Sequence, residues 1–341
     1  MNKVNGFMAI VTVLSLLGAP LQAVADELNV YSARNEALIK PALDKFTAQT
    51  GIKVNLITGN ADALISRMKS EGQFSPADVL LTTDVGRLER AKNMGLTKTF
   101  TAASVKKIVP ANLRDPNMQW TALTLRARPI MYATDRVTPE SLSSMSALTD
   151  EQWKNRICIR SSGNVYNQSM VSAMIAIDGE EQTLAWAKGM VENFARTPKG
   201  GDRDQIKAVA AGQCDLAIAN TYYLAGMLNS SDAEEVAAAK KVTVFWPDQA
   251  AAGTHINISG IAVAKYAKNV EQANQLIDYM LTDESQAWYA EINHEYPVKN
   301  GIALSQTLQA MGTFKAQDVS LNKVGTYNDR ALRLMDKAGW K

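Results

Sequence analysis

The sequence is poor in the residues on which most metal enzymes and nucleic-acid-binding proteins depend. Only two of its 341 residues are histidines, His255 and His294, so a centre built from several histidines is impossible. Lysine and arginine (36) almost balance aspartate and glutamate (34), and no basic stripe or tail is present, which argues against nucleic acid as a partner. The chain also lacks the motifs of phosphate-binding loops, serine-hydrolase elbows and paired Cys-x-x-Cys sites.

The motifs of one enzyme class are present only in part. Residues 66–69 and 104–107 both fit Ser-x-x-Lys, the nucleophile motif of penicillin-binding enzymes. That spacing often arises by chance, and the companion motifs Ser-Asp-Asn and Lys-Thr-Gly are missing. We therefore expect a protein that binds a ligand and is not an enzyme.

Long apolar runs are missing as well, apart from one near the N-terminus. Lys3 precedes an apolar run over residues 7–17, and Ala23-Val24-Ala25 follows it, which is the order of regions in a secretory signal peptide. The run is too short to span a bilayer, and no cysteine follows it that could carry a lipid. We expect residues 1–25 to be removed by cleavage after Ala25, leaving a soluble protein in the periplasm.

Predicted strands and helices alternate along the rest of the chain, which indicates an α/β fold of two lobes with largely parallel sheets. In the first part, residues 28–31, 52–57 and 77–81 are predicted strands, and residues 36–50 and 61–71 are predicted helices. Later strands are expected over 156–160, 215–219, 242–246 and 256–264, and later helices over 168–177, 183–193, 204–211, 270–281 and 284–291. Crossovers near 126–132 and 251–257 would join the lobes as a hinge around a ligand.

Tyrosines gather at two predicted strand-to-helix corners of the second lobe. Tyr222 and Tyr223 follow the strand at 215–219, and Tyr166 follows the strand at 156–160. A phenolate oxygen is a hard anionic ligand that suits a hard trivalent cation such as ferric iron. Half-buried packing, or a stacking wall for an organic ligand, is the alternative role for a Tyr-Tyr pair. Three tyrosines at equivalent rims of one lobe favour the metal.

The only two cysteines precede these tyrosines. Cys158 and Cys214 lie eight positions before Tyr166 and Tyr222, so the cysteines are close together if the tyrosines converge. In an exported chain they can form a disulfide, and two buried free thiols are the alternative.

Over essentially all of the mature chain, the sequence resembles the periplasmic ferric-iron-binding proteins, the receptor components of iron ABC importers. The tyrosine-rich subfamily that needs no synergistic anion is the most similar. The matching stretches are Val30-Tyr31-Ser32-Ala33-Arg34, Ser75-Pro76-Ala77-Asp78-Val79, residues 120–132, residues 163–166, residues 220–223, Ser259-Gly260 and Glu295-Tyr296-Pro297.

The resemblance implies a type II periplasmic binding protein fold, in which hinge strands join two Rossmann-like lobes. It places the first lobe at 26–127 and 254–302, and the second at 128–253 and 303–341. It further implies that Tyr166, Tyr222 and Tyr223 bind ferric iron in the interlobe cleft, and that the protein, a monomer, passes the ion to an ABC permease in the inner membrane.

The first lobe departs from the family pattern. Family members usually carry histidine where this chain has Asn35, often tyrosine where it has Glu36, and in some cases a carboxylate where it has Thr83. Glu36 could supply a carboxylate ligand, or it could only open a helix, where it would complement the helix dipole. Asn35 suits a helix cap and is a poor ferric ligand. Water, or an anion such as carbonate or citrate, could fill the open position.

Arginines are candidates to favour phenolate over phenol or to bind such an anion, since their side chains stay charged and can form forked hydrogen bonds. We select Arg34, Arg128 and Arg160; Arg128 matches a pocket arginine of the family, and each of the three could equally be structural. Because ligand tyrosines must lose protons, affinity for the ion should fall as the pH drops.

A receptor for a small organic or oxyanion solute on the same fold is the alternative function. In that case the tyrosines and Trp120 would stack on the solute or donate hydrogen bonds to it. The two functions differ in colour, because ferric tyrosinate centres absorb visible light and a solute receptor does not.

Overall fold

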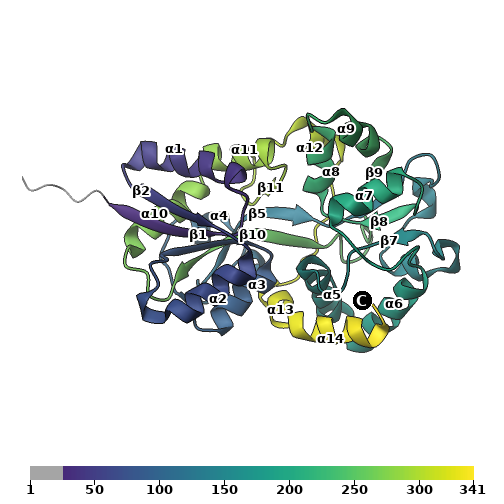
Figure 1. Ribbon diagram of the computed structural model, residues 1–341, viewed down its shortest axis with the longest axis horizontal. Coiled ribbons are helices and arrows are strands. Elements are labelled where there is room, and N and C mark those ends of the chain that lie inside the picture. Colours follow the sequence, from purple (N-terminus) through teal and green to yellow (C-terminus); the bar gives the residue numbers. More distant parts are fainter. Residues whose placement is uncertain (1–25) are drawn as a thin grey trace, which may run out of the picture.

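The computed structural model describes residues 26–341, which form two lobes side by side with helices on both faces of each lobe's sheet (Figure 1). The expected signal peptide and its cleavage site fall in residues 1–25, outside the described part. None of the helices in residues 26–341 combines the length and the apolar character that crossing a membrane requires.

The sheet of the first lobe contains seven strands in the order β11-β5-β10-β3-β1-β2, with β4 beside β10. The strands are β1 (Glu27–Ser32), β2 (Lys53–Thr58), β3 (Val79–Thr83), β4 (Thr97–Lys98), β5 (Thr121–Ala127), β10 (Ile256–Ala264) and β11 (Tyr296–Pro297). The expectation of largely parallel sheets is wrong, because four of the six strand pairings in this lobe are antiparallel, as are two of the three in the second lobe. β1 is parallel to β2 and β3, whereas β10 is antiparallel to β3 and β5. The reason is that β10 enters directly from the second lobe, without the helical crossover that a parallel neighbour needs.

The first lobe's helices are α1 (Lys40–Thr50), α2 (Ala61–Glu71), α3 (Val85–Asn93), α4 (Val105–Ile108), α10 (Val270–Met280) and α11 (Asp283–Ile292). We expected one helix over 36–50, and the structure divides it. Glu36–Leu38 is a short 3-10 helix, and Ile39 then leaves helical geometry at φ −136° before α1 begins. Pro41 explains the division, because proline lacks the N–H that a continuous helix would require and is accepted in a first turn.

The second lobe has four strands in the order β7-β8-β6-β9: β6 (Ile130–Ala133), β7 (Ile157–Cys158), β8 (Leu216–Ile218) and β9 (Val242–Phe245). Its helices are α5 (Val165–Asp178), α6 (Glu180–Glu192), α7 (Asp202–Ala210), α8 (Thr221–Leu228) and α9 (Ala233–Ala239). Alternate residues face opposite sides of this sheet, so Leu216 and Ile218 belong to one hydrophobic cluster and Ala217 to another. Helices therefore cover both of its faces.

Three stretches of backbone lie together where the lobes meet. Only Arg128 and Pro129 separate β5 from β6, and the Arg128 N–H donates to the His255 carbonyl, 2.9 Å away, just before β10. The Thr254 N–H donates to the Lys315 carbonyl, also at 2.9 Å. A bundle of extended segments thus joins the lobes, as a hinge requires.

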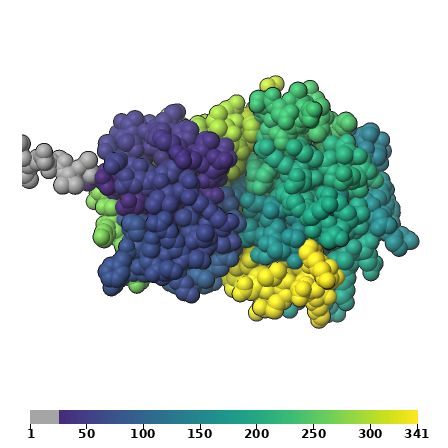
Figure 2. Space-filling model, in the orientation of Figure 1, coloured from purple at the N-terminus to yellow at the C-terminus, as the bar shows by residue number. Residues whose placement is uncertain are grey.

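Of the C-terminal helices, α12 (Gln306–Ala310) precedes Lys315 of this junction, and α13 (Leu321–Thr326) and α14 (Asn328–Ala338) follow it. Leu321 and Val324 of α13 belong to the hydrophobic cluster of the first lobe, whereas Leu334 and Met335 of α14 belong to a cluster of the second. In Figure 2 the yellow helices α13 and α14 lie along the lower edge of the molecule, where they run from the junction of the lobes onto the second lobe. We expected residues 303–341 to belong to the second lobe, but α13, which lies among them, packs against the first lobe. The limits of the lobes therefore remain a proposal.

Candidate functional site

The three candidate tyrosines lie in the first turns of two helices. Tyr166 is the second residue of α5, and Tyr222 and Tyr223 are the second and third residues of α8. These helices follow β7 and β8, which are parallel neighbours, so both helices start at the same edge of the sheet. The rings of Tyr222 and Tyr223 have centroids 4.3 Å apart. Unpaired N–H groups at helix starts favour negative charge, which suits phenolates.

The two cysteines form a disulfide in the structure. Cys158 is the last residue of β7 and Cys214 precedes β8, with their Cα atoms 5.9 Å apart. The bond joins the two strands that carry the tyrosine-bearing helices. Both cysteines lie in the hydrophobic cluster on one face of this sheet.

The tyrosines open into a cavity of about 220 Å³ between the lobes. From the first lobe, it is lined by Ala33, Arg34, Asn35, Leu38, Thr83, Arg126, Asn293 and Glu295. Thr83 of β3 and Tyr166 of α5 both line the cavity, so they face it from opposite lobes. Thr83 and Tyr166 come from positions 83 residues apart in the chain, and only the fold brings them together.

Arg126 is the cavity residue that sequence reasoning missed. Its side chain is only 2% exposed, and its guanidinium carbon lies 5.4 Å and 5.2 Å from the ring centroids of Tyr166 and Tyr222. Nε donates to the Ser259 hydroxyl at 3.2 Å, while Nη1 is buried and has no hydrogen-bond partner. A buried guanidinium with a free donor beside two phenols is a ready counter-charge for an anionic ligand set.

The surroundings of the phenols affect their pKa values differently. Burial would raise the pKa of Tyr166, but the Arg126 guanidinium and hydrogen bonds from the Tyr222 and Thr83 hydroxyls hold it below the usual tyrosine value. Burial, followed by the negative charge of ionised Tyr166, raises the pKa of Tyr222 and of Tyr223. Tyr166 is therefore the first of the three to ionise.

Arg34, a candidate from the sequence, lies in the cavity wall and pairs with Glu295 at 2.9 Å. Glu295 also accepts hydrogen bonds from Ser259, at 2.7 Å, and from Thr124. Burial would raise the pKa of Glu295, but Arg34 and then Arg126 hold it below the usual carboxyl range. This carboxylate is thus ionised, and its oxygens already accept hydrogen bonds from Arg34, Thr124 and Ser259.

The other two candidate arginines share one carboxylate behind the tyrosines. Arg128 and Arg160 pair with the two oxygens of Asp202 at 2.8 Å and 2.6 Å. Arg128 also donates to Asn167 and Asn220, so it braces the starts of α5 and α8 and does not line the cavity. The guanidinium of Arg160 lies 5.7 Å from the ring centroid of Tyr166.

The two first-lobe ligand candidates occupy different places. Asn35 lines the cavity and caps the 3-10 helix, where its side-chain oxygen accepts from the Ala37 N–H at 3.0 Å. Glu36 is exposed, opens that helix and is not among the lining residues. The alternative role for Trp120 has no support in the fold, because Trp120 is fully buried and donates to Glu89 at 2.6 Å.

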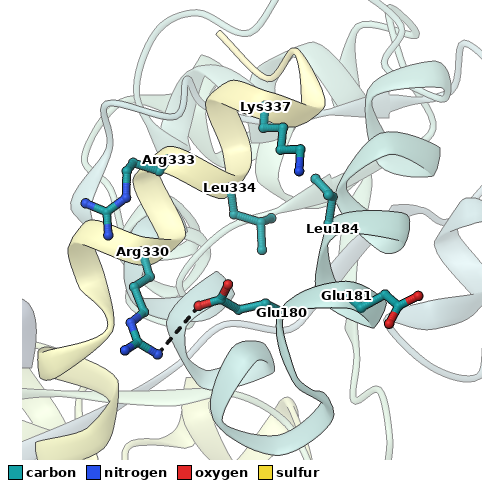
Figure 3. A pocket seen from close by; sticks show the side chains of 7 residues that line it. All are labelled: Glu180, Glu181, Leu184, Arg330, Arg333, Leu334 and Lys337. Carbon is teal, nitrogen blue, oxygen red and sulfur yellow. Dashed lines mark ion pairs between the residues drawn. The ribbon is translucent and has the colours of Figure 1, made fainter.

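Elsewhere in residues 26–341, the side chains are less suited to hold a metal ion or a small ligand than those of this cavity. No group of three or more histidine, cysteine, aspartate or glutamate side chains there could hold a metal ion. A larger hollow of about 620 Å³ lies between α6 and α14 (Figure 3). Charged side chains dominate it, with Glu180 pairing to Arg330 at 3.5 Å, as in a solvated groove between two surface helices.

Comparisons with known proteins agree with this architecture. Iron uptake protein A1 of Synechocystis is 48% identical over 315 residues, which cover 92% of this chain and 88% of that protein. The Trichodesmium (IdiA) (FutA) structure in complex with iron and citrate ligands is 45% identical with a TM-score of 0.90, over 92% of this chain and 100% of that one. The ferric binding protein from Campylobacter jejuni is 37% identical with a TM-score of 0.87, over 92% and 100%.

The family model for bacterial extracellular solute-binding proteins matches residues 42–316, which include most of both lobes, their crossovers and all three tyrosines. That stretch is far more than half of the chain. The chain belongs to the bacterial extracellular solute-binding proteins.

Proposed function

We propose that this protein is a periplasmic receptor that binds ferric iron in the interlobe cleft and delivers it to an ABC permease. The observation that carries the proposal is the convergence of Tyr166, Tyr222 and Tyr223 beside the unpartnered Nη1 of Arg126. Phenolate oxygens are hard donors that suit a trivalent ion. The names of relatives that share nearly the whole length of this chain, iron uptake protein A1 and ferric binding protein, support the same cargo.

The phenols would bind the ion in a definite order of ionisation. Tyr166, with its lowered pKa, offers the first negative oxygen. Tyr222 and Tyr223 have raised pKa values because each would add negative charge to a buried site. The incoming cation reverses this cost, since it replaces two protons with one ion of higher charge. The site therefore releases protons as it captures iron.

The charges around the phenols leave room for an anion beside the metal. Arg34, Arg126, Arg128 and Arg160 form ion pairs with only two carboxylates, Glu295 and Asp202. Three phenolates would balance a ferric ion, so the surplus positive charge favours a further anionic ligand on the first-lobe side. Carbonate or citrate fits this role, and the citrate in the Trichodesmium structure supports the second.

Delivery would depend on lobe closure. The extended crossovers beside Arg128 and Thr254 are the only covalent links between β-sheets in residues 26–341, apart from the C-terminal segment. A rotation about them would change the distance between Thr83 and Tyr166 and thus expose or bury the ion. A permease would bind the loaded, closed form in preference to the open one. The role we propose includes no catalytic step.

The test is a visible absorption spectrum of the mature protein with ferric citrate added. We expect a broad charge-transfer band in the native protein and a shifted or weaker band in Tyr223→Phe. Tyr132→Phe is a matched control, because Tyr132 lies on β6 outside the cavity lining. The absence of a band in the native protein would contradict ferric binding through tyrosinates and would favour an organic solute.

A further inference from the structure

The residue after Thr83 has an unusual backbone. Asp84 adopts φ 81° and ψ 126°, a left-handed conformation that L-residues rarely accept. Its side chain is fully buried. Asp84 joins β3 to α3, so its conformation sets the direction in which Thr83 faces the cavity. Such a conformation persists only where the surrounding contacts hold it.

Three separate parts of the molecule hold the Asp84 carboxylate. Oδ1 accepts from the Gly86 N–H of α3 at 2.8 Å. Oδ2 accepts from the Asn257 side chain at 2.8 Å, close to the point where β10 leaves the crossover. The third donor is the hydroxyl of Ser169, 2.6 Å from Oδ1, and it belongs to α5 of the second lobe. One carboxylate thus links a strand end, a crossover and the opposite lobe.

Ser169 connects this contact to the proposed iron site. It lies three residues after Tyr166 on α5, which is close to one helical turn. The Asn328 side chain at the start of α14 donates to the same hydroxyl at 3.3 Å. On the other side, Thr83 directly precedes Asp84 and lines the same cavity as Tyr166. The hydrogen bond from Ser169 to Asp84 therefore joins the end of β3 to α5, beside the two cavity residues Thr83 and Tyr166.

We propose that Asp84 and Ser169 are a positioning pair that sets the register of the two lobes at the tyrosine site. Neither residue lines the cavity, and both act through their neighbours, Thr83 and Tyr166. The buried hydrogen bond between them favours the arrangement in which Thr83 meets Tyr166. Its loss lets the lobes separate more easily and releases the ion faster. The effect on iron release rests on the proposed function, whereas the effect on lobe arrangement does not.

The test compares two serines on the same helix. Ser169→Ala removes the interlobe hydrogen bond, while Ser172→Ala removes a buried hydroxyl that bonds only to the Gln168 carbonyl of its own helix. We expect Ser169→Ala to increase the radius of gyration of the metal-free protein in small-angle X-ray scattering. We also expect iron release to a strong chelator to become about tenfold faster, the size expected for one hydrogen bond to a charged group. Ser172→Ala should change neither quantity.

A second variant separates the contact from the backbone conformation. Asp84→Gly removes the carboxylate, and glycine accepts φ 81° without strain. It should reproduce both effects of Ser169→Ala, and combining the two should add little, because they remove the same link. If Ser169→Ala matches the native protein and Ser172→Ala in both scattering and release, the pair has no positioning role. If the native protein takes up no iron, the proposed function fails, and scattering of the metal-free variants still decides the positioning pair.

Discussion

The two walls of the cavity differ in what they offer an ion. The wall from the second lobe presents three phenols on helix starts that a disulfide holds together. The wall from the first lobe presents the cations Arg34 and Arg126, and its one carboxylate, Glu295, is occupied by neighbours. The anionic donors are thus concentrated on one lobe, and the counter-charge comes from the other.

This division indicates how capture proceeds. If the phenols are the ligands, as proposed, an ion would meet them before the lobes close, because all three belong to the second lobe. Closure would then bring the first lobe over the ion as a cover and as a holder of the accompanying anion. The following predictions test this difference between the walls, from the largest expected effect to the smallest.

Removing a phenol should have the largest effect. In Tyr222→Phe the second-lobe wall loses one anionic donor, and we expect ferric affinity to fall by at least about 100-fold, the upper end of the effect for residues that only support a ligand. Competition with a chelator of known affinity measures this. Thermal unfolding of the metal-free variant should stay close to that of the native protein. An unchanged ferric affinity would show that the second-lobe wall is not the main source of ligands.

The pH dependence should also originate in the second-lobe wall. Tyr222 and Tyr223 have raised pKa values, so both are protonated near neutral pH and must release protons on binding. Affinity should therefore rise with pH and fall as the pH drops, and the protons of Tyr222 and Tyr223 should contribute about two decades per pH unit. Chelator competition at several pH values, corrected for the chelator's own protons, gives this slope. In Tyr222→Phe the slope of log affinity against pH should decrease by about one. An equal slope in both proteins would show that Tyr222 does not release a proton when the ion binds.

Removing the counter-charge should have a smaller effect. Arg126→Met takes away the cation that lowers the pKa of Tyr166, so that pKa should rise and the affinity profile should move to higher pH. At fixed pH we expect a loss of about 10- to 100-fold, as for other groups that support metal ligands. Arg126→Lys keeps the charge and should recover part of the loss. A profile that does not move in Arg126→Met would show that Arg126 has only a packing role.

The smallest effect should come from Glu36. Its side chain is exposed and outside the cavity lining, so Glu36→Gln should change ferric affinity by less than about twofold, as for most exposed substitutions. The same competition assay provides the measurement. A loss of affinity comparable to that of Tyr222→Phe would contradict the difference between the walls. It would mean that Glu36 reaches the ion after closure and serves as an anionic ligand from the first lobe.

The tyrosine cluster could be anticipated from the sequence because it depends on local order. A strand followed by a helix places the residues between them at a sheet edge, and Tyr166, Tyr222 and Tyr223 all occupy such corners. The alternating pattern also predicts the α/β class, which the solved structures of relatives confirm. Both inferences use information that lies within about ten residues of chain.

Features that depend on distant pairing could not be anticipated. Arg126 is a single charge in an otherwise uncharged strand, and its role appears only when β5 pairs with β11 and brings Glu295 near it. We selected Arg128 instead, two residues further along, where the strand has already ended and the side chain reaches Asp202. The contact of Asp84 with Ser169 joins residues 85 positions apart and has no local signal.

The disulfide has a consequence for when the site can form. Cys158 and Cys214 are 56 positions apart, and without their bond the turns that carry the phenols are joined only by non-covalent contacts, among them two residue pairs of β7 and β8 and the hydrogen bonds of Arg128 to Asn167 and Asn220. Covalent closure of that long loop restricts the unfolded chain and so favours the assembled corner. If the tyrosines bind iron as proposed, thiol oxidation would act as a maturation step, and a chain kept under reducing conditions would hold the phenols in a looser arrangement. Competence to bind metal would thereby be linked to the compartment in which the chain folds.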